Sequence, residues 1–130
     1  MGLILDTNFV ISAERDARKR ETGRTTRFFE LHREEEFYLT FTVAGELACG
    51  KSAAGREAWQ KLLRPYGMLG WDREISFVYG ELFRKLASRG QLIGTNHLWI
   101  ASTALRHGMG IVTKNHSEFS RVDGLHVLDY

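Results

Sequence analysis

The stretch that decides the fold is residues 2–11, GLILDTNFVI, in which a short apolar run ends in the carboxylate of Asp6. Such a run, closed by small polar residues, predicts a buried β-strand that carries Asp6 at its C-terminal tip. In open α/β sheets, ligands bind at the carboxyl ends of the strands. We therefore expect Asp6 to lie where the chemistry of the fold takes place.

Short apolar segments and helical patterns alternate along the rest of the chain. Strands are predicted at residues 37–41, 68–71, 110–113 and 125–128. Helices are predicted at residues 25–33, 42–50, 52–65, 72–86 and 96–108, with Thr42 and Asp72 as N-caps. The charged residues 14–27 are either a solvated helix with its loop or a mobile arm. Short apolar strands between helices indicate a central parallel sheet covered on both faces, a three-layer α/β/α fold.

Length and composition favour one domain over residues 1–130. Hydrophobic residues make up 43% of the chain and include three Trp and eight Phe, enough for one core. The net charge of +2 is compatible with a nucleic-acid partner without requiring one. Cys49 is the single cysteine, so we expect a packed thiol and a reducing compartment. The sequence has no membrane-length apolar run and no signal peptide, which predicts a cytoplasmic protein with no membrane partner.

Four places in the sequence put polar side chains at strand ends or helix starts. They are Asp6, Glu46, residues 95–97 (TNH) and residues 113–118 (TKNHSE). In a doubly wound sheet these can face one crevice, where two carboxylates repel each other unless a hard cation binds between them. Mg²⁺ or Mn²⁺ held by carboxylates and waters is the chemistry of phosphodiester hydrolysis. A nucleotide-binding fold is not expected, because no Gly-rich phosphate loop follows the first strand.

Each candidate acid also has a purely structural interpretation. Asp is a good helix N-cap, so Asp6 could serve only to cap a helix. Glu46 and Glu118 could be solvated surface residues. The small residues Gly45 and Ala48 beside Glu46 suit a crowded cleft, but these spacings alone are weak evidence for a metal-dependent nuclease.

Four motifs together resemble one known family. Residues 5–8 (LDTN), 42–50 (TVAGELACG), 94–101 (GTNHLWIA) and 112–119 (VTKNHSEF) resemble, in this order, the motifs of PIN-domain ribonucleases. Within that family they resemble the VapC toxins of bacterial toxin–antitoxin modules, and residues 119–130 are similar to the end of these toxins. The resemblance covers essentially the whole chain. The fold it implies, a parallel sheet between helices, agrees with the fold predicted above.

The resemblance implies an endoribonuclease toxin that depends on Mg²⁺ or Mn²⁺ and arrests translation by cutting RNA, often tRNA. Asp6 matches the first acid of the family and is expected to bind the metal, and Glu46 matches the second acid. Asn115 and Glu118 lie in the region that supplies the fourth polar group. Such toxins usually form homodimers. A cognate VapB-type antitoxin holds them inactive, and they meet operator DNA only through it.

One position departs from the family pattern. His97 stands where the family carries its third acid, so it is the expected third catalytic residue and second metal ligand. A helix N-terminus disfavours a cation by about 0.3–1 kcal/mol, which predicts a neutral imidazole that can bind Mn²⁺ but suits Mg²⁺ poorly. Three alternatives stay open: a substitution that disarms the enzyme, a natural site with its activity retained or shifted toward Mn²⁺, or a natural pseudo-nuclease. The candidate catalytic residues are Asp6, Glu46, His97, Asn115 and Glu118.

Basic and amide side chains beside the cleft are expected to hold the RNA. Lys114 is the best placed, together with Asn8; further candidates are Arg15, Arg18, Lys19, Arg20 and Arg24. Phosphate contacts of this kind lose affinity steeply as the salt concentration rises.

Two functional classes remain. One is a metal-dependent ribonuclease toxin, with a DNA nuclease or a ribosomal-RNA processing enzyme as variants on the same site. The other is a non-catalytic PIN-like module that binds antitoxin or RNA.

Overall fold

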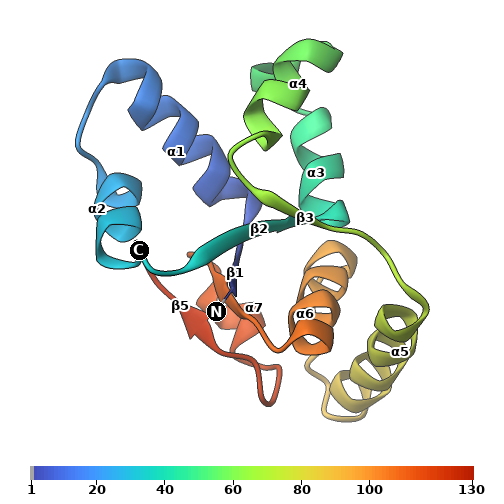
Figure 1. Cartoon of the computed structure of the whole chain (residues 1–130). Coiled ribbons are helices and arrows are strands. Elements are labelled where there is room, and N and C mark those ends of the chain that lie inside the picture. Colours follow the sequence, from blue (N-terminus) through green and yellow to red (C-terminus); the bar gives the residue numbers. More distant parts are fainter. Residues whose placement is uncertain (1) are drawn as a thin grey trace.

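The computed structural model describes residues 2–130, the Ser52 side chain excepted. At its centre is a parallel sheet in the order β3-β2-β1-β4-β5 (Figure 1). The strands are β1 (Gly2–Leu5), β2 (Glu36–Thr40), β3 (Gly67–Leu69), β4 (Gly110–Val112) and β5 (Val127–Leu128). The helices are α1 (Thr7–Lys19), α2 (Arg24–Leu31), α3 (Phe41–Ala48), the 3-10 turn η1 (Lys51–Ala53), α4 (Arg56–Leu63), α5 (Arg73–Ser88), α6 (Thr95–His107) and α7 (His116–Phe119).

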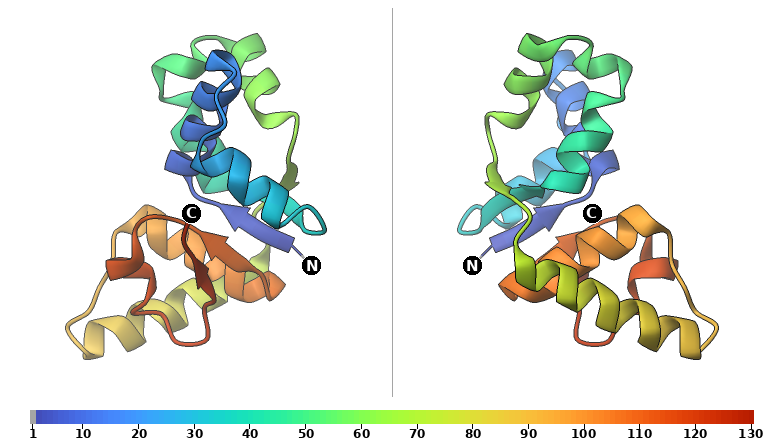
Figure 2. Two further views of the ribbon diagram at one scale, coloured as in Figure 1. Left: turned by 90° about the vertical axis from the view of Figure 1, so that its left-hand side faces the viewer. Right: turned by 90° about the vertical axis from the view of Figure 1, so that its right-hand side faces the viewer.

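Helices cover both faces of this sheet. The chain passes from β1 through α1 and α2 to β2, and through α3 and α4 to β3, moving along the sheet in one direction. It then returns through α5 and α6 to β4, on the other side of β1, and continues through α7 to β5. Because parallel crossovers are right-handed, the reversal places α5–α7 on the face opposite to α1–α4, as Figure 2 shows. The predicted three-layer α/β/α fold is confirmed.

The reversal of strand order creates a crevice between β1 and β4. These two strands pair directly, with Leu5 opposite Val112 at their carboxyl ends. The connection after β1 leads to α1 on one face, and the connection after β4 leads to α7 on the other. Ligands of open α/β sheets bind where neighbouring connections diverge in this way. The topology therefore points to Asp6 and Thr113, the residues that follow β1 and β4.

Helix caps decide where two of the predicted helices begin. The N-cap of α3 is Thr40, whose Oγ1 accepts the N–H of Val43 at 3.2 Å. The prediction that Thr42 caps this helix was therefore wrong, because the extended residue just before the helix is the last residue of β2 (φ −83°, ψ 162°). Asp72 caps α5 as predicted, since its Oδ1 accepts the N–H of Ile75 at 2.9 Å.

The charged segment 14–27 forms a solvated helix end and a loop. Helix α1 runs to Lys19, and Arg20 ends it in the left-handed region (φ 54°). The hydroxyl of Thr25 in α2 donates to Oδ2 of Asp16 in α1 at 2.7 Å, which ties the two helices together. A Cβ at Gly23 would lie 2.3 Å from Oδ2 of Asp16, so a larger residue there would displace this carboxylate. Of the two alternatives for this segment, the helix with its loop is the one observed.

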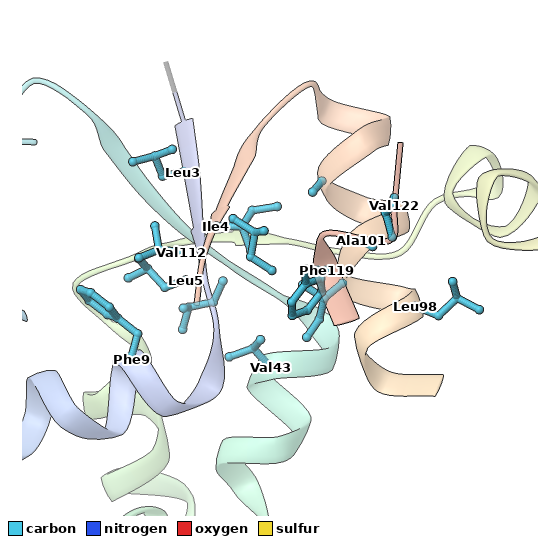
Figure 3. Packing of buried hydrophobic residues seen from close by; sticks show 14 of the residues in the cluster. Leu3, Ile4, Leu5, Phe9, Val43, Leu98, Ala101, Val112, Phe119 and Val122 are labelled. Carbon is cyan, nitrogen blue, oxygen red and sulfur yellow. The ribbon is translucent and has the colours of Figure 1, made fainter. Parts of the chain in front are cut away.

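The core lies on both sides of the two central strands. Leu3, Ile4 and Leu5 of β1 are buried together with side chains from the helices on either face, Phe9 on one and Phe119 on the other (Figure 3). Cys49 is exposed, so the expectation of a packed thiol was wrong. Within residues 2–130, no helix has the length and apolar character needed to cross a membrane.

Phe9 is the aromatic anchor of this core, and its loss should destabilise the fold. It is fully buried, and its ring makes edge contacts with Phe28, Phe29 and Tyr130 at centroid distances of 5.5, 5.3 and 4.7 Å. Truncation to Ala leaves a cavity, so Phe9→Ala should lower the free energy of unfolding by about 3–5 kcal/mol in urea denaturation. Leu31→Ala is the control, because this side chain is 81% exposed and its removal should cost about 0.5 kcal/mol or less. Equal losses for the two variants would contradict this assignment.

Candidate active site

Asp6 lies at the carboxyl end of β1 and is almost buried, with 7% of its surface exposed. Its Oδ1 accepts the N–H of Thr7 at 2.8 Å, so it is the N-cap of α1. Its Oδ2 accepts the hydroxyl of Thr113 at 2.7 Å, across from the end of β4. A nearly buried carboxylate needs such donors, because an unpaired one is costly to desolvate. Capping and a position in the crevice are therefore both properties of Asp6, not alternatives.

A second carboxylate reaches the same place from α3. The hydroxyl of Thr7 donates to Oε1 of Glu46 at 2.8 Å. The side-chain amide of Asn96, at the start of α6, lies 3.4 Å from Oε2 of Glu46. Thr7 thus links the Asp6 and Glu46 carboxylates, with its backbone N–H on one and its hydroxyl on the other. Glu46 is held in the site and is not an ordinary solvated helix residue.

A third group of contacts is centred on Glu118 in α7. Its Oε1 accepts the backbone N–H of Gly94 at 2.8 Å, just before α6. Its Oε2 accepts the side-chain amide of Asn115 at 2.8 Å and lies 2.5 Å from Nδ1 of His97. The hydrogen bond from Gly94, together with those from Asn115 and His97, lowers the pKa of Glu118 against the opposing effect of its burial. Glu118 is therefore an ionised acceptor that joins α7 to the start of α6.

A cleft of about 420 Å³ opens over these groups. Its lining residues are Asp6, Thr7, Asn8, Glu46, His97, Lys114 and Asn115. Seven residues were the main candidates from the sequence, the five catalytic candidates together with Lys114 and Asn8, and six of these line the cleft. The seventh, Glu118, does not line it and lies behind His97. The further basic candidates do not line it; they are Arg15, Arg18, Lys19, Arg20 and Arg24.

Lys114 stands beside the cleft but is already engaged. Its Nζ contacts Oδ1 of Asp129 at 2.8 Å, donates to the backbone carbonyl of Tyr130 and lies 4.5 Å from the centre of the Tyr130 ring. The hydrogen bond from Lys114 holds the pKa of Asp129 well below its usual range, with further help from the Tyr130 N–H and His116. A phosphate that binds Lys114 would compete with Asp129 for this ammonium group.

Asp6 and Glu46 offer the hard oxygen donors that Mg²⁺ and Mn²⁺ prefer. Within residues 2–130, no three His, Cys, Asp or Glu side chains come together as a ready-made cation site. Mg²⁺ does not require one, because it keeps several waters and binds through one or two carboxylates. Each carboxylate has about four acceptor positions, and the contacts described above occupy only some of them. The donor set therefore fits a hydrated divalent cation.

Two threonines that hold the site together had no assigned role in the sequence analysis. Thr7 bridges the two cleft carboxylates, and Thr113 binds Asp6 while its Oγ1 also accepts the N–H of Asn115 at 3.0 Å. The signal for both was their position at the carboxyl end of a strand, since Thr7 is two residues beyond β1 and Thr113 directly follows β4. Hydroxyls at such positions can reach the neighbouring strand end.

Comparison with known proteins gives one consistent family. The PIN domain family matches residues 3–125. Ribonuclease VapC1 of Rickettsia felis is 29% identical over 136 residues, covering 98% of this chain and 96% of the relative. Ribonuclease VapC2 of the same organism is 30% identical over 130 residues, covering 96% of this chain and 95% of the relative.

Solved structures agree with these relatives. The structure of VapBC2 from Rickettsia felis, bound to a DNA fragment from its promoter, contains a chain with a TM-score of 0.82 and 26% identity. The match covers 100% of this chain and 99% of that one. VapBC-1 from nontypeable Haemophilus influenzae contains a chain with a TM-score of 0.80 and 28% identity, with 99% and 98% covered.

The Thr113 hydroxyl should contribute measurably to stability. Thr113→Val keeps the shape of the side chain but leaves the nearly buried Asp6 carboxylate without one of its donors. We expect the free energy of unfolding in urea to fall by about 1–3 kcal/mol. Thr113→Ser, which keeps the hydroxyl, should lose less than the Val variant. A Val variant as stable as the unmodified chain would show that this hydrogen bond does not hold the strand ends together.

Proposed function

Because this chain belongs to the PIN domain family and is of the VapC type, we propose that it is an endoribonuclease toxin. Its active site would be the cleft between the ends of β1 and β4. The observation that carries the proposal is the pair of carboxylates, Asp6 and Glu46, that line one cleft and are linked by Thr7. Relatives that match nearly the full chain are named ribonucleases, which supports RNA as the substrate class. Transfer RNA is the first substrate to test, and arrest of translation is the expected consequence of cutting it.

A divalent cation, Mg²⁺ or Mn²⁺, would supply a water activated for attack on a phosphodiester and would offset charge on the phosphate. Asp6 and Glu46 are the residues we assign to hold it, and Asp6 is kept in place by Thr113. Asn115 and His97 complete the polar wall of the cleft. These residues orient the reacting groups, since their side chains are fixed by hydrogen bonds before any substrate arrives.

We assign RNA binding to Lys114 and Asn8 at the edge of the cleft. Lys114 would exchange its contact with Asp129 for a phosphate oxygen. Basic residues near the end of α1, such as Arg15 and Arg18, could extend this surface, since they lie on the helix that starts at the cleft. Binding through phosphates should weaken steeply with salt, so an RNA affinity that does not change in a salt titration would exclude this mode.

A non-catalytic PIN-like module is the second candidate function. The observation that favours it is His97, an imidazole at the position where the resemblance leads one to expect an acid. With an imidazole there, the cleft keeps two carboxylates, Asp6 and Glu46, while the Glu118 carboxylate is engaged behind it. Such a module would bind antitoxin or RNA through the same cleft, and its binding would not depend on a divalent cation.

The proposed partner is a cognate VapB-type antitoxin, which would also provide the contact with operator DNA. An apolar groove of about 420 Å³ lies between α1, α2 and α4, and its lining includes Val10, Ala17, Phe29, Leu62 and Tyr66. Helix α1 also carries Thr7 and Asn8 of the cleft, so a segment in this groove would lie on the helix that opens the active site. Apolar side chains of another protein could be buried in this groove, and we propose it as the binding site for the antitoxin.

The groove is suited to apolar side chains of that partner. Burial raises the pKa of Tyr66 to about 12, so its hydroxyl is neutral and adds no charge to the groove. Glu14 and Lys61 also line the groove and provide polar contacts. Solved complexes similar to this chain are VapBC assemblies, which supports an antitoxin as the occupant.

A homodimer is the proposed assembly of the toxin itself, to be tested by analytical ultracentrifugation.

Cleavage of RNA tests the proposed activity. The chain, its Asp6→Asn and Glu46→Gln variants and its His97→Asp variant are incubated with total tRNA in Mg²⁺, in Mn²⁺ and in EDTA. We expect cleavage with a divalent cation, none in EDTA, and a rate lower by about a hundredfold or more in the Asn and Gln variants. Glu74→Gln, which neutralises an exposed carboxylate on α5, is the control and should cut like the unmodified chain.

The pattern of activities separates the two functions. If only His97→Asp cuts, the cleft is a ribonuclease site in which His97 suppresses activity. If no variant cuts while RNA or antitoxin still binds in EDTA, the non-catalytic module is the correct assignment. Cleavage that survives both EDTA and Asp6→Asn would exclude the proposed site.

Antitoxin binding tests the groove between α1 and α4. Ala17→Glu places a charge in the groove at an exposed position of α1. It should weaken binding of a cognate VapB-type antitoxin by about tenfold or more, because the charge is desolvated on binding. Ala87→Glu, at an exposed position of α5 that does not line the groove, is the matched control. Affinities are measured by isothermal titration calorimetry. Equal affinities for both variants would place the antitoxin elsewhere.

A further inference from the structure

His97 is held in one orientation by residues that surround its ring. Its Nδ1 lies 2.5 Å from Oε2 of Glu118, and its ring packs against the buried ring of Phe119 at a centroid distance of 4.9 Å. Its other nitrogen, Nε2, makes no hydrogen bond within residues 2–130 and is not among their buried, unpaired polar atoms. Because His97 lines the cleft, Nε2 is the ring atom available to a ligand there.

The contacts of Nδ1 decide which ring nitrogen carries the proton. Oε1 of Glu118 accepts the N–H of Gly94, and Oε2 accepts the amide of Asn115. An ionised carboxylate accepts hydrogen bonds at both oxygens in this way. A separation of 2.5 Å between this carboxylate and Nδ1 requires a proton between them, which the imidazole supplies. The amide of Asn115 also approaches Nδ1, but at 3.3 Å. A neutral His97 therefore carries its proton on Nδ1 and its lone pair on Nε2.

We propose that Glu118 positions His97 as a nitrogen ligand, through Nε2, so that this cleft selects borderline divalent cations such as Mn²⁺ and Co²⁺ over Mg²⁺. The inference rests on the proposed function, because it concerns the cation of that same site. Histidines that bind metals almost always donate their other N–H to a carboxylate, a carbonyl or water, which fixes the ring and makes the ligating nitrogen more basic. The pair formed by Glu118 and His97 has this arrangement.

The direction of the selectivity follows from the ligand types. Mg²⁺ demands oxygen ligands and gains little from an imidazole, whereas affinity for nitrogen-containing sites rises from Mn²⁺ to Co²⁺ along the first transition row. In this cleft one nitrogen from His97 would join a carboxylate oxygen of Asp6 and bound waters, because no three His, Cys, Asp or Glu side chains within residues 2–130 come together as a ready-made site. Glu118 is not itself a ligand in this arrangement, because it does not line the cleft and its oxygens already contact Gly94, Asn115 and His97. It is a positioning residue.

Cation affinities measured without RNA test the proposal. Mg²⁺, Mn²⁺ and Co²⁺ are titrated by calorimetry into the unmodified chain and into His97→Asp and Glu118→Gln. We expect the unmodified chain to prefer Co²⁺ and Mn²⁺ over Mg²⁺, and His97→Asp to reduce that preference by about tenfold or more. Glu118→Gln should lower the Co²⁺ affinity by about ten- to a hundredfold and the Mg²⁺ affinity by less, a difference that a merely structural role would not produce.

A control variant and a spectroscopic measurement complete the test. His107→Asn removes an exposed histidine at the other end of α6 and should leave all three affinities unchanged. Long-range ¹H–¹⁵N NMR spectra of the metal-free chain should show the His97 proton on Nδ1. Addition of Zn²⁺, a diamagnetic cation that also binds imidazole nitrogen, should shift the Nε2 resonance. Metal-free thermal unfolding verifies that each variant folds.

Two results would overturn the proposal: a His97 protonated on Nε2 when neutral, or a cation preference that His97→Asp leaves unchanged. Neither result depends on RNA cleavage. The nuclease assignment can therefore fail while the nitrogen ligand is confirmed, or the reverse.

Discussion

The nearly buried carboxylate of Asp6 is the constraint on which the arrangement of the site depends. A charge with so little exposure persists only where hydrogen-bond donors replace water. One donor, the N–H of Thr7, comes from the helix that Asp6 caps, but the other, the hydroxyl of Thr113, comes from the end of a different strand. Satisfying Asp6 therefore adds a side-chain hydrogen bond to the backbone pairing that joins the ends of β1 and β4. Because Thr113 also accepts the N–H of Asn115, the constraint extends to the segment that carries Asn115 and Glu118.

The helices that begin at the crevice explain how it tolerates several carboxylates. Helix α1 begins directly after Asp6, and the backbone N–H before α6 is bonded to Glu118. The N-terminus of a helix carries a partial positive charge and unpaired N–H groups, so it stabilises a nearby carboxylate. Two of the acids at this end of the sheet are thus held by helix starts. Glu46 is held by side chains instead, the hydroxyl of Thr7 and the amide of Asn96.

Helix α1 connects the two surfaces to which a function has been assigned. Its first residues, Thr7 and Asn8, line the polar cleft, and Val10 and Ala17 line the apolar groove beside α4. Its buried Phe9 packs against α2 and against Tyr130 near the end of the chain. Tyr130 in turn contacts Lys114 at the edge of the cleft. A protein bound in the groove would therefore lie against the helix that begins at the polar cleft, because residues of α1 line both surfaces.

The sequence by itself determined the layers of the fold and the place of the site. Short apolar strands can be satisfied only when both faces of a sheet are covered, and a carboxylate at the end of such a strand lies at the edge where ligands bind. Asp6 could be assigned from this pattern and Asp72 from its position before a helical run, whereas the role expected of Glu46 came from the family resemblance. The tertiary structure alone decided the partners of each polar group. Thr7 and Glu46 are 39 residues apart, Asp6 and Thr113 are 107 apart, and the pairing of His97 with Glu118 joins two separate helices. Strand order and helix packing create these contacts, because a local pattern shows that a polar group is present but not which distant group will satisfy it.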